Sequence, residues 1–430
     1  MPDESLSLND QRRRTALLSV IAISIAVRIA IILNFRERAS YDTAGFVLTA
    51  NAIRHLDFSR YDGRRTPIYP LLLLAAGMDW RTVRIIQSVL GIAIAAMMFQ
   101  VGWYRTRNLA ISLIVGLLSS LAISALLYEQ IIYSETLCTF WIALSVLACA
   151  RIDVEVGSRA RNYALLGIAA ALAGMTRPMF LFLGPLYFAI ALARTRVRSA
   201  LALALAPTLV LALGWSAFNK ITIDYLGVTT TTGFNLSNHS GGFIELAPPR
   251  YKSIAEIYMR YRPWQIARMG SHTMTIWVAE DELERATGMS TPQLSKALTR
   301  MSLEMFVAHP MLYLESVARA WMRFWGIGFF DFVRAYQESA SPTLYATIVA
   351  LGSLQLAINL AFLMIAGIVL LKWIRGRVRF NFDLAIIALV LTASLVEAFM
   401  EYGENVRYLA PLVPLIIYVV AVRLGEATVG

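Results

Sequence analysis

The chain alternates long apolar runs with short polar segments. A helix needs about 20 apolar residues to cross a hydrocarbon core of about 30 Å, and the pattern predicts about ten such spans. The first run follows the basic start "QRRRTALLSV" and lacks a small-residue cleavage site, so we interpret it as a retained anchor. The predicted spans lie near residues 15–35, 82–104, 108–127, 135–150, 162–176, 178–193, 199–219, 343–371, 383–400 and 408–423.

Two polar segments between these spans are long, a first loop at residues 36–81 and an insert at residues 220–342. The insert separates an N-terminal transmembrane part, residues 1–219, from C-terminal transmembrane helices, residues 343–430. The sequence therefore predicts an all-α polytopic membrane protein with additional helices at the membrane surface.

The second half of the insert, "LSKALTRMSLEMFVAHPMLYLESVARAWMRFW", places apolar and basic residues on different faces at helical spacing. Such a pattern is typical of an amphipathic helix that lies along a membrane surface. Trp321 and Trp325 are the side chains that we expect to anchor it at the interface.

Composition agrees with a membrane protein. Of the 430 residues, 58% are hydrophobic and 16% are charged. The net charge of +11 does not indicate nucleic-acid binding, because the arginines form short clusters between apolar runs instead of one basic stripe. Cys138 and Cys149 lie in one apolar run, about 16 Å apart in a helix, so they cannot form a disulfide with each other.

The arginine clusters predict an orientation. With a cytoplasmic N-terminus, the inner loops carry most of the clustered basic residues, as the positive-inside rule requires. The first loop is an exception, because it would face outward with seven arginines. Binding an anion is one reason for a basic outer loop. The inner-loop residues are Arg12, Arg13, Arg14, Arg105, Arg107, Arg151, Arg159, Arg161, Arg194, Arg196, Arg198, Lys372, Arg375, Arg377 and Arg379.

Asp42 is the first candidate functional residue. It begins "YDTAGFVLTANAI", where Phe46, Ala50 and Ile53 recur at helical spacing and predict a short helix on the bilayer with Asp42 at its N-terminal end. A carboxylate there can serve as a general base for a substrate hydroxyl. Capping of the helix N-terminus is the alternative role.

Arg64, Arg65 and Tyr69 form the second candidate group, in "GRRTPIYPLLLL". Pro67 and Pro70 stiffen the chain where it returns to the membrane, and a guanidinium held there suits a phosphate through paired hydrogen bonds. The alternative is that these arginines contact lipid headgroups.

Arg177, in "AGMTRPMFLFLGP", joins two runs of about 15 residues. Each such run covers about 22 Å as a helix, less than the hydrocarbon core, so we expect Arg177 to be recessed beneath the outer surface. A buried cation without a nearby carboxylate in sequence needs a ligand or a partner on another helix. The alternative is an ion pair with a residue such as Glu135 or Glu397.

The last predicted span begins with "EYGENVRYLAPL", in which Arg407 either binds an anion or pairs with Glu404, and Tyr408 follows it. Glu135, in "IIYSETLCTFW", begins another span on the same side. Together the carboxylates and arginines predict one outward cavity in which an anionic leaving group is stabilised while a hydroxyl is deprotonated.

The sequence resembles bacterial GT-C glycosyltransferases of the protein-mannosyltransferase-like and aminoarabinose-transferase-like superfamily. The resemblance covers most of the chain in order. It is carried by Asp42 with Phe46 and Ala50, "RTPIYPLLLL", "YSETL", "TRPMFLFLGP", "TTGFNLSN", "AHPMLYLESVAR" and "ENVRYLAPLVPL".

The resemblance implies a GT-C fold and a role for each matching position. Asp42 would be the general base, and Glu135 would orient the acceptor or a neighbouring arginine. A substrate loop would carry Asn235, Asn238 and His239. Basic and aromatic groups near the donor phosphate would be Arg64, Arg65, Tyr69, Arg177, Arg407 and Tyr408.

The resemblance also implies the substrates and the location. The enzyme would sit in the bacterial inner membrane with its active site facing the periplasm. It would take a sugar from a polyprenyl-phosphate carrier to a lipid, glycan or protein acceptor, by one inverting displacement. No metal ligand set is evident, although a divalent cation shared by Asp42 and Glu135 is left open.

Two other functions remain open at this stage. A carrier or flippase for an anionic lipid-linked glycan would use the same arginines without chemistry, but it would expose its site to both sides, and no internal repeat of fixed period is visible. A ligase that takes a whole glycan from a diphosphate carrier is the alternative among enzymes.

Overall fold

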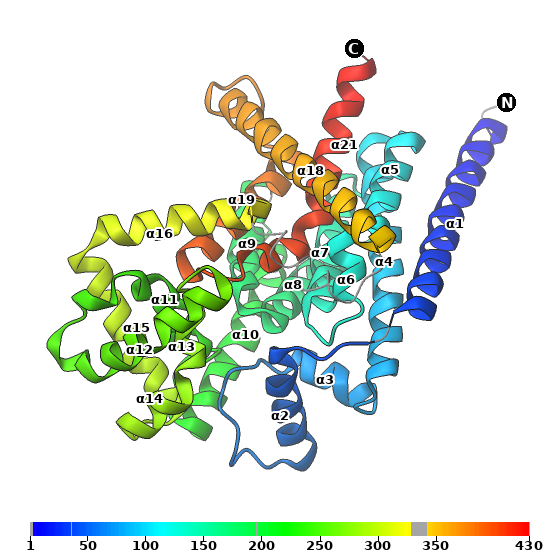
Figure 1. Ribbon diagram of the computed structural model, residues 1–430. Helices are drawn as coiled ribbons and strands as arrows, with labels where there is room; N and C mark the ends of the chain where they lie inside the picture. Colours follow the sequence, from blue (N-terminus) through cyan, green and yellow to red (C-terminus); the bar gives the residue numbers. More distant parts are fainter. Residues whose placement is uncertain (1–2, 36, 195–196, 328–341, 430) are drawn as a thin grey trace.

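The computed structural model describes residues 3–35, 37–194, 197–327 and 342–429. These residues are mostly helical and contain no β-strand, with one isolated bridge between Arg38 and Ile131 (Figure 1). The predicted all-α class is confirmed.

Eight helical segments of the described chain are long and apolar enough to cross a membrane. They indicate a multi-pass membrane protein. The sequence predicts about ten spans, and eight helical segments of the described chain reach the length and hydropathy of a span. The segments are built from α1 (Asp3–Asn34), α4 (Trp80–Thr106), α5 (Leu109–Leu121) with α6 (Ile123–Tyr128), α7 (Glu135–Asp153), α10 (Arg198–Ile223), α18 (Pro342–Ile374), α19 (Phe382–Met400), and α20 (Asn405–Leu409) with η5 (Ala410–Leu412) and α21 (Val413–Val429).

The other two predicted spans, at residues 162–176 and 178–193, are also helical. They form α8 (Arg159–Thr176), then the 3₁₀ turn η1 (Pro178–Phe182) and α9 (Leu183–Arg194). Helix α8 begins with two arginines, and the apolar segment after it is only Pro178–Ala193, so neither is among the eight. Between them, Arg177 has extended backbone angles, because Pro178 disfavours helical geometry in the preceding residue.

Short polar side chains start several of the membrane helices. Asp79, Asn108, Ser158 and Asn381 each accept a hydrogen bond from a backbone N–H in the first turn of α4, α5, α8 and α19, respectively. These caps satisfy donors that a helix N-terminus leaves free, and each is worth about 1 kcal/mol. The polar residues between apolar runs therefore set where the helices begin.

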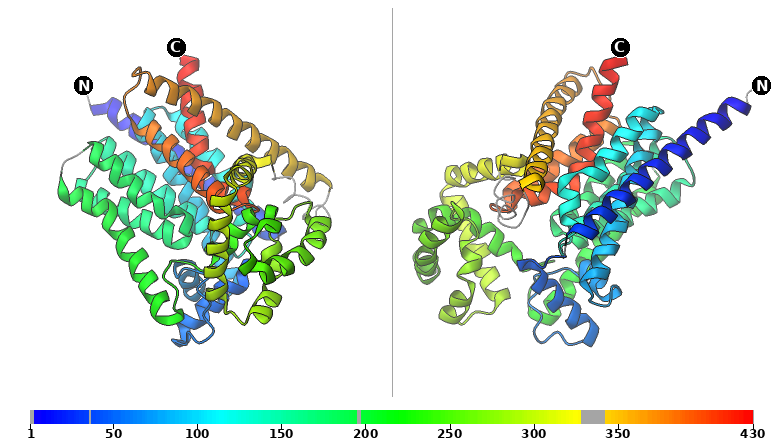
Figure 2. Two further views of the ribbon diagram at one scale, coloured as in Figure 1. Left: turned by 90° about the vertical axis from the view of Figure 1, so that its left-hand side faces the viewer. Right: turned by 45° about the vertical axis from the view of Figure 1, so that its right-hand side comes forward.

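Both described ends of the chain lie at one end of the bundle (Figures 1 and 2). The first loop, with α2 (Tyr41–His55) and α3 (Ile68–Ala75), lies at the opposite end. The predicted helix after Asp42 is thus present, and its buried Phe46 and Ala50 pack with Tyr69 of α3.

The insert is a helical body beside the bundle, displaced toward the end that carries the first loop (Figure 2). Since α10 continues to Ile223, the insert begins after that residue. Its core is formed by apolar side chains of several short helices. The elements are α11 (Thr231–Ser240), η2 (Gly241–Leu246), η3 (Pro249–Tyr251), α12 (Lys252–Met269), α13 (Thr275–Val278), α14 (Glu280–Thr287), α15 (Thr291–Ala308), α16 (Pro310–Met322) and the π-helical turn η4 (Arg323–Ile327).

The insert differs from two expectations. The segment expected to be a loop is the helix α11, whose Phe234 and Leu236 pack in the core of the insert. The two tryptophans of the amphipathic segment are not interface anchors. Trp325 is 2% exposed and stacks on Phe362 of α18, and Trp321 donates from Nε1 to Ser394 Oγ of α19 at 3.1 Å. The amphipathic pattern thus also reflects packing against the bundle.

Helix α8 is held against α10 at a glycine. A Cβ on Gly167 would collide with the backbone carbonyl group of Leu203, so only glycine allows this approach. Small residues permit such close helix packing in membranes. We expect Gly167→Ala to force the helices apart and to lower stability by about 1–3 kcal/mol. Thermal unfolding in detergent measures this, with Gly367→Ala in α18 as the control because its Cβ would meet open space. An equal effect of both changes would contradict the packing argument.

Candidate active site

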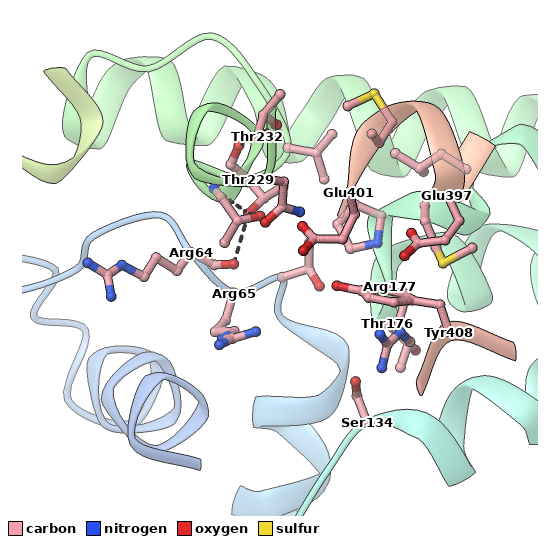
Figure 3. A pocket seen from close by; sticks show the side chains of 18 of the residues that line it. Arg64, Arg65, Ser134, Thr176, Arg177, Thr229, Thr232, Glu397, Glu401 and Tyr408 are labelled. Atoms are coloured by element: carbon pink, nitrogen blue, oxygen red, sulfur yellow. Dashed lines mark hydrogen bonds between the residues drawn. The ribbon is translucent and has the colours of Figure 1, made fainter. Parts of the chain in front are cut away.

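A cavity of about 420 Å³ lies where the first loop, the start of the insert, the turn after α8 and the end of α19 meet (Figure 3). Its walls combine charged, hydroxyl and apolar side chains. The charged and polar lining residues are Asp42, Arg64, Arg65, Thr66, Ser134, Thr176, Arg177, Thr229, Thr231, Thr232, Asn235, Glu397, Glu401, Arg407 and Tyr408.

Asp42 lines this cavity and does not cap its own helix. Ser40 and Thr43 form a capping box at the start of α2, which rules out the predicted alternative that Asp42 is the N-cap. Asp42 instead forms two ion pairs. Its Oδ1 lies 2.6 Å from Arg65 Nη2, and its Oδ2 lies 2.6 Å from Arg407 Nη1.

These ion pairs determine the protonation of Asp42. Burial by itself would raise the pKa of the carboxyl group, but the charges of Arg407 and Arg65 outweigh burial and hold the pKa well below its usual range. Asp42 is therefore ionised at neutral pH. In this arrangement it is also a weak base, because a proton would have to displace two guanidinium partners.

Arg65 is positioned by the loop that carries it. The guanidinium lies 4.7 Å from the ring centre of Phe46, and Gly45 leaves the space that its side chain crosses. The loop itself is tied to the insert, since Thr230 N donates to Gly63 O at 3.0 Å and Thr229 Oγ1 donates to Arg64 O at 2.8 Å. The insert thus contributes to the placement of Arg65.

Glu135 joins two arginines from distant parts of the chain. It is the first residue of α7 and is 1% exposed. Its Oε1 accepts hydrogen bonds from Arg177 Nη1 and Arg407 Nε. Of the partners considered for Arg177, the structure selects Glu135, and the expected burial of Arg177 is also observed, at 5% exposure.

The arginines of the cavity are already paired. Arg407 also donates from Nη1 to Glu404 at 2.9 Å, which is one of its two predicted roles. Three carboxylates, Asp42, Glu135 and Glu404, therefore balance Arg65, Arg177 and Arg407. An anion that enters must compete with these carboxylates for guanidinium groups.

Aromatic rings hold the planes of two guanidinium groups. The guanidinium of Arg177 lies 4.3 Å from the ring centre of Tyr408, and that of Arg407 lies 3.9 Å from the ring centre of Tyr133. Stacking on an aromatic face orients a guanidinium and leaves its edge for hydrogen bonding. Tyr408, predicted beside the donor phosphate, lines the cavity.

Arg64 points elsewhere, although its backbone reaches the cavity. Its guanidinium pairs with Asp62 at 3.2 Å and with Glu280 of the insert, and it lies over the rings of Phe234 and Trp277 at 5.6 and 5.7 Å. Figure 3 shows the side chain extending away from Glu401 and Arg177. Its side chain therefore connects the first loop to the insert.

Four other predicted residues do not line the cavity, namely Glu135, described above, and Tyr69, Asn238 and His239. Tyr69 is fully buried and donates to Gln87 Oε1 at 2.8 Å. His239 Nδ1 lies 2.6 Å from Ser316 Oγ, and burial lowers its pKa to about 3, so the ring is neutral. Asn238 accepts from Met274 N at 3.0 Å and donates to Glu401 Oε1 at 2.9 Å. Of the residues predicted in this segment, only Asn235 lines the cavity.

Glu397 and Glu401 line the cavity, although neither was assigned a role from the sequence: Glu401 was only part of the charged segment before the last span, and Glu397 only a possible partner of Arg177. They lie one turn apart at the end of α19, and both are at most 3% exposed. Glu397 Oε1 accepts from Asn405 Nδ2 at 3.1 Å. Two carboxyl groups at i and i+4 near the end of an apolar span were a signal for functional groups, since such residues are costly in a membrane.

A shared cation for Asp42 and Glu135 conflicts with their ion pairs. Both carboxylates bind arginines, and no group of three or more His, Cys, Asp or Glu residues in the described chain is placed to hold a metal ion. Comparison with protein-family models, curated proteins and solved structures finds no match for this chain.

Proposed function

We propose that the chain is a membrane glycosyltransferase. It transfers a sugar from a polyprenyl-phosphate carrier to a hydroxyl group of a lipid, glycan or protein acceptor on the outer face of a bacterial inner membrane. The observation that carries the proposal is the cavity in which ionised Asp42 lies between Arg65 and Arg407, beside the buried Arg177. A carboxylate and several guanidinium groups in one cavity supply a proton acceptor and a site for a departing phosphate.

The cavity also has a wall suited to the first isoprene units of such a donor. Met179, Leu181 and Phe182 follow Arg177 along the cavity, and Val396 and Met400 face it from α19. This apolar lining begins next to Arg177, so a phosphate bound at the arginine can be followed directly by hydrocarbon.

The reaction is a single displacement at the anomeric carbon. The acceptor oxygen forms a bond to that carbon while the bond from the carbon to the phosphate oxygen breaks, and the acceptor proton passes to Asp42. The leaving group is the polyprenyl phosphate, whose negative charge is neutralised by Arg65, Arg177 and Arg407. Attack opposite the leaving group inverts the configuration of the sugar.

Donor binding activates Asp42 in this mechanism. The phosphate competes with Asp42 for Arg65 and Arg407, and a carboxylate that loses guanidinium partners becomes more basic. Asp42 therefore accepts a proton only when the donor is in place.

A transfer assay with purified protein tests the proposal. The full chain in nanodiscs is given a panel of polyprenyl-phosphate sugars, with lipid extract as the acceptor source, and products are identified by mass spectrometry. The proposal predicts transfer with inversion. Binding of a donor without any transfer would instead favour a carrier.

Arg177→Gln provides a test of the donor site. The change removes the charge but retains hydrogen-bonding capacity, and Glu135 keeps Arg407 as its partner. A hydrogen bond to a charged group is worth about 1.5–3 kcal/mol, so we expect the donor KM to rise about 10- to 100-fold. Arg319→Gln is the control, since Arg319 is an exposed arginine of the insert that pairs with Glu315. Unchanged donor kinetics in Arg177→Gln would contradict the assignment.

A further inference from the structure

The carboxyl group of Glu401 has one oxygen without a partner. Glu401 is 3% exposed and lines the cavity at the C-terminal end of α19. Its Oε1 accepts from Asn238 Nδ2 at 2.9 Å, whereas Oε2 is buried and has no hydrogen-bond partner among the described residues. Buried polar atoms in folded proteins are nearly always paired. An unpaired oxygen on a cavity wall therefore points to a contact with a bound molecule.

The protonation of Glu401 makes this oxygen a hydrogen-bond donor. Burial raises the pKa of the carboxyl group to about 8, against the lowering effect of the hydrogen bond from Asn238. The group is thus largely neutral at pH 7. Because Oε1 already accepts a hydrogen bond, the proton is best placed on Oε2, which is then able to donate to a bound molecule.

Neighbouring groups extend this polar wall. Glu397, one turn earlier in α19, and Asn235 of α11 line the same cavity. Amide and neutral carboxyl groups both donate and accept hydrogen bonds, which is what sugar hydroxyl groups require. Arg177 lines the same cavity. A donor whose phosphate contacts Arg177 would therefore place the hydroxyl groups of its sugar in the cavity that this wall borders.

We propose that Glu401 is a specificity-determining residue whose unpaired oxygen donates a hydrogen bond to a hydroxyl group of the neutral donor sugar, with Glu397 and Asn235 completing the subsite. This role rests on the glycosyltransferase function proposed above. It assigns a sugar subsite to the wall formed by α19 and α11, distinct from the arginines that bind the phosphate.

Binding measurements on two variants test the subsite. Glu401→Gln keeps an acceptor for Asn238 and a donor toward the cavity, and Glu401→Leu keeps neither. The probes are farnesyl phosphate and farnesyl-phosphoryl derivatives of glucose, mannose, galactose and arabinose, bound to the full chain in nanodiscs. The wild type should bind at least one sugar-bearing probe more tightly than farnesyl phosphate. Glu401→Gln should keep that preference, and Glu401→Leu should lose about tenfold of it.

The matched control is Glu315→Leu, which removes an exposed carboxylate of the insert outside the cavity lining. It should keep the preference for the sugar. The subsite is overturned by a wild type without any preference, by Glu401→Leu that keeps it, or by equal losses in Glu401→Leu and either Glu401→Gln or Glu315→Leu. Affinity for farnesyl phosphate itself reports separately on the phosphate site of the proposed function.

Discussion

Asp42→Asn is expected to slow sugar transfer by about 10²- to 10⁴-fold, the range associated with loss of a general base. The amide is close in size to the carboxyl group but cannot accept the acceptor proton with comparable strength. Arg407 retains Glu135 and Glu404 as partners, so the fold should survive the change. Single-turnover transfer at saturating donor measures the effect on the chemical step.

The same variant should bind the donor phosphate more tightly. Asp42 occupies both Arg65 and Arg407 in the free protein, and an amide competes for these guanidinium groups far less than a carboxylate does. We expect the dissociation constant for farnesyl phosphate to fall about tenfold. Transfer at the wild-type rate would remove Asp42 from catalysis. Weaker phosphate binding would show that Asp42 and the phosphate do not compete.

Glu135→Ala is expected to destabilise the protein by about 3–5 kcal/mol, the cost of removing one partner of a buried ion pair. Glu135 is nearly inaccessible and accepts hydrogen bonds from both Arg177 and Arg407. Without it, two buried guanidinium groups at the junction of α7, α8 and α20 repel each other. Thermal unfolding in detergent, with loss of farnesyl phosphate affinity as a second readout, measures the effect.

Glu315→Ala is the matched control for this prediction. Glu315 also pairs with an arginine, Arg319, but both side chains are more than half exposed, and exposed pairs contribute about 0–1 kcal/mol. The difference between the two variants isolates the contribution of burial. A Glu135→Ala variant as stable as Glu315→Ala would mean that water reaches the cluster freely.

Much of the fold follows from the hydrophobic pattern. The apolar runs became helices within a few residues of the predicted limits, except that the first helix already begins at Asp3, because burial in lipid and the need to pair every backbone group allow little else. The helix after Asp42 was also predicted from the spacing of Phe46 and Ala50. The length of an apolar run was a less reliable guide to the number of membrane spans. The segments on either side of Arg177 are helical, but they are shorter or less apolar than the eight spans.

The candidate site was predictable only in part. Asp42, Arg65, Arg177 and Arg407 do meet in one cavity, as the density of charge at one end of the spans indicated. The direction of a side chain could not be predicted, because adjacent residues in a loop face different ways according to their tertiary partners. Tyr69 and His239 were polar residues of the core, and the pairing of Glu135 with two arginines depends on three helices that are far apart in sequence.

Arg64 and Arg65 are consecutive, yet one contacts Glu280 in the insert and the other contacts Asp42. A single peptide unit therefore mechanically couples the extramembrane body to the base. A displacement of the insert would be transmitted through this peptide unit to the guanidinium that pairs with Asp42. In the proposed enzyme, contact of the acceptor with the insert would thereby change the surroundings of the base.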